Sequence, residues 1–226
     1  MIILIIFTKL EWSKLVKIIK PSAERIIPPC KYYEVCGGCS LEHLSYENQL
    51  SLKKRQLEDL FRKNLNLDLD IIPIANPQPY NYRNKISLKV ENGKIGFYQN
   101  NSNKLIPIKA CLIVNDDINK LLEELEYLGV KNGKITIRIN KDSKLLIIIN
   151  SKDKISYSEL TKKFKIAGII YNDKLIYGDD YFIEEINGYK FKINYNSFFQ
   201  TNNYINSELL KLLNENTPNN LNILDL

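Results

Sequence analysis

Apolar residues open the chain in an uninterrupted run, and polar positions interrupt the pattern soon afterwards. The run "MIILIIF" at residues 1–7 and the segment "WSKLVKIIKPS" at residues 12–22 are both typical of strands. Pro28 and Pro29 follow, and two successive prolines block helix continuation. The pattern therefore predicts a short β region that ends before residue 30.

A helical spacing begins after this boundary. Leu50, Leu57 and Phe61 fall on one stripe, which predicts a long helix from Ser40, its expected N-cap, to Lys63. The outer surfaces of this helix are crowded with cations: Lys53, Lys54, Arg55, Arg62 and Lys63. We interpret the cations Lys53, Lys54 and Arg55 as a solvated face. Two further prolines in "IANPQPYNY" then break the pattern.

The region from residue 76 to residue 192 is dominated by strand-like segments. "NKISLKVENGKIGFYQ" predicts a hairpin that turns at Asn92-Gly93, and "KITIRINKDSKLLIIIN" predicts a second one that turns at residues 141–143. Helices are expected at residues 116–128 and in "SYSELTKKF", the latter capped by Ser156 or Ser158. Three more strands follow at residues 166–172, 174–178 and 181–195, the last bent at Asn187-Gly188. The sequence thus predicts an α+β domain with a largely antiparallel central sheet.

The last part of the chain changes character. "NNYINSELLKLLNEN" predicts an amphipathic helix, and "LNILDL" at residues 221–226 predicts a short apolar strand that ends in an acid. Many α/β nucleotide-binding domains begin with such a strand, although no glycine-rich loop follows it within these residues. We expect residues 193–226 to be the first helix and strand of a truncated Rossmann-like domain.

Composition narrows the class of protein. With 44% hydrophobic and 26% charged residues, the chain is typical of a globular protein and not of an overall disordered one. The net charge of +6 is carried mainly by lysine, which suits a polyanionic partner but also suits a low-GC codon bias. The opening apolar run is far shorter than the roughly 20 residues that cross a bilayer and has no features of a secretory signal. We expect a cytoplasmic protein, with no membrane partner and with reduced thiols.

Three of the four cysteines lie within ten residues, in "CKYYEVCGGCS". Cys30, Cys36 and Cys39 have the spacing C-x5-C-x2-C, and Cys111 follows after 71 intervening residues. Gly37-Gly38 allows a tight turn whose amides can point at a negatively charged centre. Four thiolates can hold zinc or a four-iron cluster, and three clustered cysteines plus a distant one favour the cluster. Inert buried thiols are the alternative, above all for Cys111 in its apolar run "IKACLIV".

No catalytic residue stands out. A nucleophilic cysteine needs a base, and the single histidine, His43, is expected on the polar part of the long helix as a solvated residue. The sequence shows no histidine–aspartate partnering for a triad and no distinctive carboxylate pair.

The cysteine spacing, read together with "GFYQNNSNKLIPIKACLIV", "PYNYRNKISLKV", "NYNSFFQTN" and "NILDL", resembles a known family over residues 17–226. This family is that of the RNA (uracil-5-)-methyltransferases that use S-adenosylmethionine, and the most similar subgroup is the 23S rRNA enzymes with a four-iron cluster. The resemblance implies a 4Fe-4S cluster held by Cys30, Cys36, Cys39 and Cys111.

The resemblance also implies roles for residues that the spacing alone leaves open. In "SFFQTN", Gln200 would contact the cofactor S-adenosylmethionine, and Phe198 would lie near the target base. Without the resemblance, Phe198 and Phe199 would be interpreted as core aromatics. Tyr80 and the trio Tyr82, Arg83 and Lys85 pair aromatic surfaces with cations, as RNA contacts do. A strand with a solvated edge is the alternative interpretation of these residues. The resemblance implies RNA, specifically ribosomal RNA, as the partner, and we expect a monomeric protein.

By the same resemblance the chain divides into four parts. Residues 1–29 would be a remnant of an N-terminal β-barrel RNA-binding domain, residues 30–75 the iron–sulfur loop and long helix, residues 76–192 the RNA-facing domain, and residues 193–226 the start of the methyltransferase domain. The family's nucleophilic cysteine, in a Pro-Arg-x-Gly motif, is absent from this sequence. We therefore expect the chain to be inactive alone. A non-catalytic metal-bound RNA-binding module and an iron–sulfur electron carrier are the alternatives.

Overall fold

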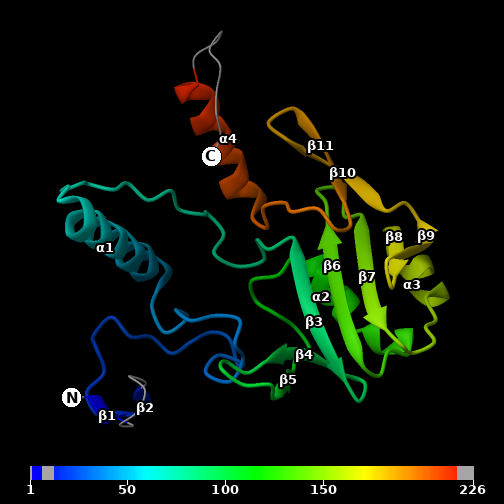
Figure 1. The fold of residues 1–226 in the computed structure, drawn as a ribbon, viewed down its shortest axis with the longest axis horizontal. Helices are drawn as coiled ribbons and strands as arrows, with labels where there is room; N and C mark the ends of the chain where they lie inside the picture. Colours follow the sequence, from blue (N-terminus) through cyan, green and yellow to red (C-terminus); the bar gives the residue numbers. More distant parts are fainter. Residues whose placement is uncertain (1, 7–12, 218–226) are drawn as a thin grey trace. The chain divides into compact units, whose positions relative to one another are not determined.

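The computed structural model describes residues 2–6 and 13–217, with side chains from Lys17 onward. The chain forms two compact units (Figure 1). The first unit comprises residues 1–31 and 39–73, and the second comprises residues 32–38 and 74–226. The predicted strand at residues 221–226 lies outside the described residues. The predicted division into four parts is not tested by this organisation and stays a prediction.

The first unit holds a β-hairpin and one long helix. Strand β1 (Ile2–Ile6) pairs with strand β2 (Ser13–Ile18) in antiparallel fashion, where the sequence predicts strands. Helix α1 spans Tyr46–Leu65, and its N-cap is Ser45, whose side chain accepts a hydrogen bond from the Asn48 amide at 3.3 Å. Within the described part of the chain, no helix is long and apolar enough to span a bilayer.

The predicted start of this helix at Ser40 is wrong, and so is the placement of His43 on it. Leu44 forms a β-bridge with Arg25, and the His43 carbonyl accepts the Ile26 amide at 2.9 Å. These backbone bonds hold the chain in a turn up to residue 44, so the helix can begin only after Ser45. Burial and the charge of Arg25 lower the pKa of the His43 imidazole.

The second unit is built on a seven-stranded sheet of order β5-β4-β3-β6-β7-β8-β9. Neighbouring strands are antiparallel except β7 and β8. The two predicted hairpins are confirmed, and the first turns at Asn92 and Gly93, which have φ angles of 50° and 76°. The bounds of the strands are β3 Lys85–Glu91, β4 Lys94–Tyr98, β5 Leu105–Pro107, β6 Gly133–Ile139, β7 Leu145–Ser151, β8 Ile166–Tyr171 and β9 Lys174–Gly178.

Short helices cover one face of this sheet. Helix α2 (Asp116–Leu122) is followed by the 3-10 helix η1 (Leu125–Leu128), so the single helix predicted over residues 116–128 is broken. Both pieces bury leucines completely, which explains why the apolar pattern runs through the break. Helix α3 (Ser158–Lys163) has Tyr157 at its N-cap without a side-chain cap bond, contrary to the predicted serine cap.

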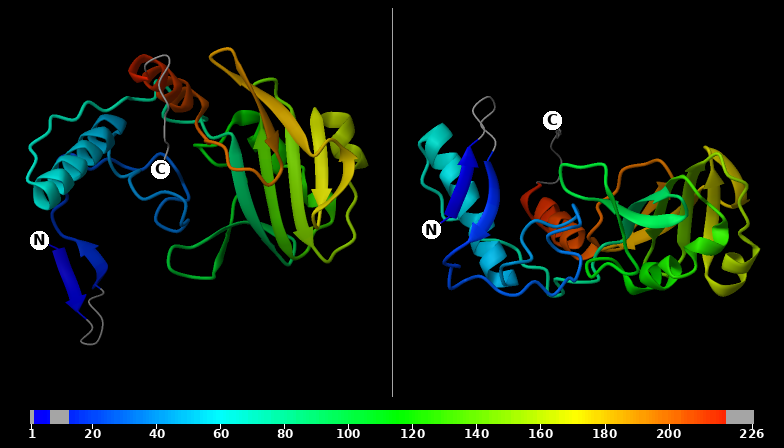
Figure 2. Two further views of the ribbon diagram at one scale, coloured as in Figure 1. Left: turned by 45° about the horizontal axis from the view of Figure 1, so that its top comes forward. Right: turned by 90° about the horizontal axis from the view of Figure 1, so that it is seen from below.

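A second layer covers part of the opposite face (Figure 2). Strands β10 (Tyr181–Ile186) and β11 (Tyr189–Asn194) form a separate hairpin, where the sequence predicts one bent strand. Phe182 and Ile193 of this hairpin belong to one buried cluster with Leu146, Ile148 and Ile170 of strands β7 and β8. Helix α4 (Asn203–Asn216) follows as predicted, and its N-cap Asn202 accepts a hydrogen bond from the Ile205 amide at 3.1 Å.

Candidate functional site

Three segments that are distant in the sequence meet just before strand β3. The amides of Asn81 and Arg83 donate to the carbonyls of Leu112 and Ile113 at 2.9 and 2.8 Å. On the other side, the Asn84 amide donates to the Thr201 carbonyl at 2.9 Å. The motif "NYRNK" therefore lies between the segment that follows Cys111 and the segment "SFFQTN".

Polar side chains hold both ends of the loop formed by residues 197–200. One guanidinium nitrogen of Arg138, Nη1, donates to the carbonyls of Asn194 and Ser197 at 3.1 and 2.7 Å. At the other end, Asn84 Nδ2 donates to the Gln200 carbonyl at 3.1 Å. Since Arg138 is buried with 3% of its surface exposed, its bonds are shielded from competing water. The backbone at both ends of this loop is therefore held by side chains from other parts of the chain.

The two phenylalanines of the loop have different environments. Phe199 packs against the buried cluster, and its ring lies 5.6 Å from that of Phe191. Phe198, next to it, is 81% exposed. Leaving a phenyl ring in water forgoes about 1.5–3 kcal/mol of burial free energy. The interpretation of both residues as core aromatics therefore fits Phe199 but not Phe198. The side chain of Gln200 is exposed as well, so both predicted contact residues are accessible.

A polar network that ends at the buried Glu184 supports this loop. Besides its bond to Gln200, Asn84 Nδ2 donates to Asn203 Oδ1 at 2.7 Å. Asn203 Nδ2 in turn donates to Glu184 Oε2 at 3.3 Å, and the Lys141 amide donates to Glu184 Oε1 at 3.2 Å. Glu184 is 1% exposed, and burial raises the pKa of its carboxyl. The sequence analysis missed Glu184, although it occupies an inward position in the alternation of β10 between Phe182 and Ile186.

The predicted RNA contacts Tyr82, Arg83 and Lys85 are all half-buried. Tyr82 lines a pocket of about 350 Å³, together with residues of the proline-rich loop and of the start of α4: Asn76, Pro77, Gln78, Asn202, Asn203 and Tyr204. Burial lowers the pKa of the Lys85 ammonium, and the charges of Arg138 and Lys134 lower it further. Lys85 thus lies in a region of accumulated positive charge.

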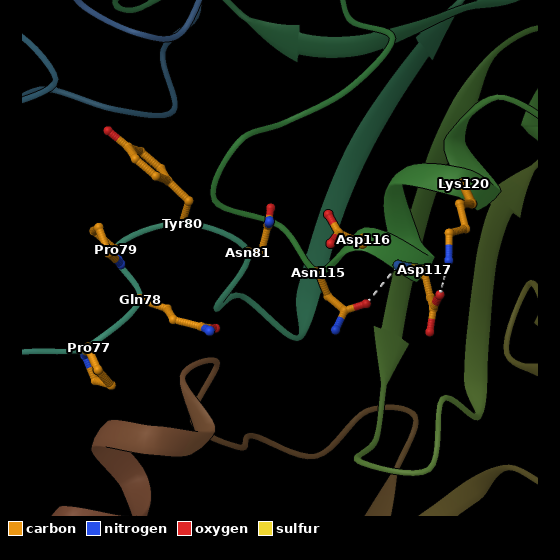
Figure 3. A pocket seen from close by; sticks show the side chains of 9 residues that line it. All are labelled: Pro77, Gln78, Pro79, Tyr80, Asn81, Asn115, Asp116, Asp117 and Lys120. Atoms are coloured by element: carbon orange, nitrogen blue, oxygen red, sulfur yellow. Dashed lines mark hydrogen bonds and ion pairs between the residues drawn. The ribbon is translucent and has the colours of Figure 1, made fainter.

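A second pocket, of about 650 Å³, lies on the other side of the proline-rich loop (Figure 3). Its residues come from that loop and from the start of α2: Pro77, Gln78, Pro79, Tyr80, Asn81, Asn115, Asp116, Asp117 and Lys120. The Asp117 carboxylate accepts bonds from Lys120 at 2.8 Å and from Ser143 at 2.7 Å, and both lower its pKa. This carboxylate is thus already satisfied by the protein.

Two of the four cysteines belong to the second unit, namely Cys36 and Cys111, whereas Cys30 and Cys39 belong to the first. Within the second unit, the segment around Cys36 is bonded to the part of the chain that leads to Cys111. The Gly37 amide donates to the Tyr98 carbonyl at 3.0 Å, and the Lys109 amide donates to the Tyr32 hydroxyl at 3.0 Å.

Glycine is required at position 37 because a Cβ atom there would lie 2.8 Å from the Tyr98 carbonyl oxygen. Cys111 is fixed by Asn119, which accepts its amide at 2.9 Å and donates to its carbonyl at 3.1 Å. All four cysteine side chains are half-buried. Cysteine thiolates are ligands that iron and zinc prefer, so the four residues are of a suitable type for either metal.

Among the described residues, no three or more histidine, cysteine, aspartate or glutamate side chains are grouped in a way that could hold a metal ion. The joint ligation of one centre by Cys30, Cys36, Cys39 and Cys111 therefore stays a prediction from their spacing. Within the second unit, hydrogen bonds join the segment that carries Cys36 to the segment that leads to Cys111, which agrees with this prediction.

Comparison with known proteins places the chain in a family. An uncharacterized RNA methyltransferase of Listeria innocua is 30% identical in an alignment 220 positions long, which covers 80% of this chain and 49% of the relative. One of Clostridium tetani is 31% identical in an alignment 231 positions long, which covers 84% of this chain and 50% of the relative. The chain belongs to this family of RNA methyltransferases. The resemblance inferred from the motifs is thereby confirmed at the level of the family.

A solved structure shares the fold of this chain. The crystal structure of the tRNA (uracil-54, C5)-methyltransferase of Pyrococcus abyssi, in complex with S-adenosyl-L-homocysteine, matches with a TM-score of 0.69 and 20% identity. The match covers 88% of this chain and 53% of that one. No protein-family model matches the chain. The chain spans about half the length of the curated relatives that it matches.

Proposed function

We propose that these 226 residues form the RNA-binding part of an RNA (uracil-5-)-methyltransferase that takes its methyl group from S-adenosylmethionine. The observation that carries the proposal is Phe198, an 81% exposed ring on a loop whose two ends are held by Arg138 and Asn84. A fixed and exposed aromatic ring can stack on an unpaired base, and each such stack contributes about 1–3 kcal/mol.

The chemistry explains why such a ring is needed. Carbon 5 of uracil is a poor nucleophile, so in this type of reaction a cysteine thiolate first adds to carbon 6, and carbon 5 then attacks the methyl group. A base removes the carbon-5 proton, and the thiol departs. The target base must leave its stack for this to happen. Phe198 would receive that base, and Gln200, exposed two residues later, would contact the cofactor.

The proposal also assigns the cysteines. We propose that Cys30, Cys36, Cys39 and Cys111 hold a 4Fe-4S cluster with a structural role, because it would link segments far apart in the sequence. This assignment accounts for all four thiols of the chain. Binding and orientation of the RNA, and not the nucleophilic attack, are therefore the roles that we give to these residues. Following the motif resemblance, we propose ribosomal RNA as the substrate.

Photocrosslinking tests the role of Phe198. Single-stranded RNA that carries one 5-bromouridine is irradiated with the full chain, and the crosslinked peptide is identified by mass spectrometry. We expect the crosslink within residues 197–200 and its loss in Phe198→Ala. Tyr127→Ala is the matched control, because Tyr127 is also an exposed aromatic residue, at 62%, but belongs to η1 on the other face of the sheet.

A second RNA with 5-bromocytidine at the same position tests the preference for uracil. Preferential crosslinking of the uracil analogue supports the proposal. Crosslinks that are spread over surface aromatics, or that survive in Phe198→Ala, would contradict it.

A further inference from the structure

Cations face cations across strands β3 and β6. The register places Lys85 opposite Arg138, Ser87 opposite Thr136, and Lys89 opposite Lys134. Because side chains alternate along a strand, these six residues share the face of the sheet opposite to the buried Ile86, Leu88 and Val90. Like charges directly opposite each other destabilise a sheet. The two pairs, Lys85 with Arg138 and Lys89 with Lys134, would therefore be stabilised by an anionic partner.

The protein itself does not balance this charge. Within the described part of the chain, none of Lys85, Lys89 and Lys134 forms an ion pair. The nearest acid on the same face of β3 is Glu91, which accepts the Tyr98 hydroxyl at 2.9 Å. Lys89 Nζ lies over the ring of Tyr98, 5.5 Å from its centroid.

Arg138 and Thr136 are buried, but the remaining four residues of this half of the sheet face are accessible. The β10–β11 hairpin packs on Leu146 and Ile148, the β7 partners of Arg138 and Thr136 (Figure 1). Ser87 and Lys134 are exposed, and Lys85 and Lys89 are half-exposed. At the centre, the hydroxyls of Ser87 and Thr136 lie 2.9 Å apart in a hydrogen bond. The accessible surface therefore presents the ammonium groups of three lysines and, between them, the hydroxyl of Ser87.

The row of cations ends at the loop that carries Phe198. Lys85 follows Asn84, which bonds to the Gln200 carbonyl, and its partner Arg138 bonds to the Ser197 carbonyl. At the other end lie Lys89 and Lys134. Four residues along a strand span about 13 Å, which is enough for more than one phosphate of a polynucleotide.

We propose that Lys85, Lys89 and Lys134, with the Ser87 hydroxyl, bind the phosphate backbone of the RNA whose base reaches Phe198. The proposal rests on the proposed function, which it deepens by naming the path of the RNA. Lysines and hydroxyls at this spacing suit phosphate oxygens, which position a nucleic acid without reading its sequence. An RNA strand, which supplies both phosphates and a base for Phe198, suits the surface better than an acidic protein.

The test measures binding of fluorescently labelled single-stranded RNA by anisotropy over a range of salt concentrations. The double variant Lys89→Gln/Lys134→Gln changes the residues farthest from Phe198. We expect about ten-fold weaker binding at low salt, and a slope of log K against log salt that is smaller by about 1.4, because each phosphate contact on a single strand contributes about 0.7. The matched control Lys174→Gln/Lys190→Gln removes two exposed lysines from β9 and β11.

A charge-preserving variant distinguishes the loss of positive charge from a loss of folding. Lys89→Arg/Lys134→Arg should bind like the wild type, because a phosphate accepts either cation. Equal binding by the Gln double variant and its control would overturn the proposal. Equally strong competition by poly-glutamate would overturn it in favour of an acidic protein partner. The crosslink at Phe198 separates the two proposals, because its presence in the wild type supports the proposed function even if the lysine variants bind normally.

Discussion

At the residue scale, Glu184 is an ionisable residue that is almost completely buried beside the Phe198 loop. It is 1% exposed, and its two oxygens accept bonds from the Lys141 amide and from Asn203. Burial disfavours the charged carboxylate more than these bonds favour it, and the nearby Asp142 adds repulsion, so its pKa is raised. The protonation of Glu184 is thus linked to the stability of the fold around the Phe198 loop.

The first prediction concerns pH. Because the pKa of Glu184 is raised above its ordinary value of 4.5, the folded state binds this proton more tightly than the unfolded state. The resulting stabilisation is complete below the ordinary value and is lost as the pH rises through the raised pKa. Above pH 4.5 the wild type should lose unfolding free energy, about 1.4 kcal/mol for each unit of the pKa shift, and its Tm should fall. We expect Glu184→Gln to lack this fall.

Thermal unfolding across this pH range, with Glu185→Gln as the control, provides the measurement. Glu185 is the neighbouring residue, and its bond to Lys141 at 3.0 Å lowers its pKa, so its stabilisation is lost as the pH falls. A wild-type Tm that rises with pH in the same way as that of Glu184→Gln would show that the buried carboxyl does not titrate as inferred.

The sequence singles out Phe198 but not Glu184, for a physical reason. The motif "SFFQTN" singles out Phe198 and Gln200, yet no local pattern distinguishes which of two adjacent phenylalanines is exposed. That difference depends on Arg138 and Asn84, which lie far from the loop in the sequence. Glu184 is recognisable only once β10 is known to have one buried face.

At the element scale, strands were predicted better than helix ends. Alternation and the Asn-Gly turn define β3, β4, β6 and β7 locally, and these predictions are confirmed. The start of α1 depends on the bridge between Arg25 and Leu44, which is a non-local contact. The separation of the β10–β11 hairpin from the main sheet depends on packing against Leu146 and Ile148. Neither the start of α1 nor the separation of this hairpin can be predicted from a short stretch of sequence.

The close approach of the segment 32–38 to β4 leads to a second prediction. Gly37→Ala should detach this segment from Tyr98, because the new Cβ atom would lie 2.8 Å from the Tyr98 carbonyl oxygen. Loss of one backbone hydrogen bond costs about 1 kcal/mol, so amide exchange in residues 32–38 should accelerate about five-fold. Hydrogen–deuterium exchange followed by mass spectrometry measures this.

Gly38→Ala is the matched control. A Cβ atom at position 38 would meet only Cys36 Sγ, at 3.4 Å, which is an ordinary contact distance. Exchange in Gly38→Ala should therefore resemble that of the wild type. Similar acceleration in both variants would mean that backbone flexibility, and not the contact with Tyr98, makes glycine necessary at position 37.

At the scale of the whole molecule, the chain combines a confirmed family membership with a site built from distant segments. The sheet brings "NYRNK", the segment after Cys111 and "SFFQTN" together through backbone bonds of Arg83 and Asn84. The same sheet presents the cations of β3 and β6 beside this junction. The residues of the proposed RNA contacts therefore all belong to the second unit, whereas the cysteines of the proposed cluster come from both units.

The proposed cluster leads to the last prediction. Protein purified without oxygen should contain about four iron and about four acid-labile sulfide per chain, with a broad absorption band that disappears in air. Cys36→Ser and Cys111→Ser should each lose both elements, and the free energy of unfolding should fall, because a cluster that binds the folded chain contributes its binding free energy to stability. Ser102→Ala, a change on an exposed loop, serves as the control. Stoichiometric zinc without sulfide would replace the iron assignment, and full iron content in Cys111→Ser would remove Cys111 from the ligand set.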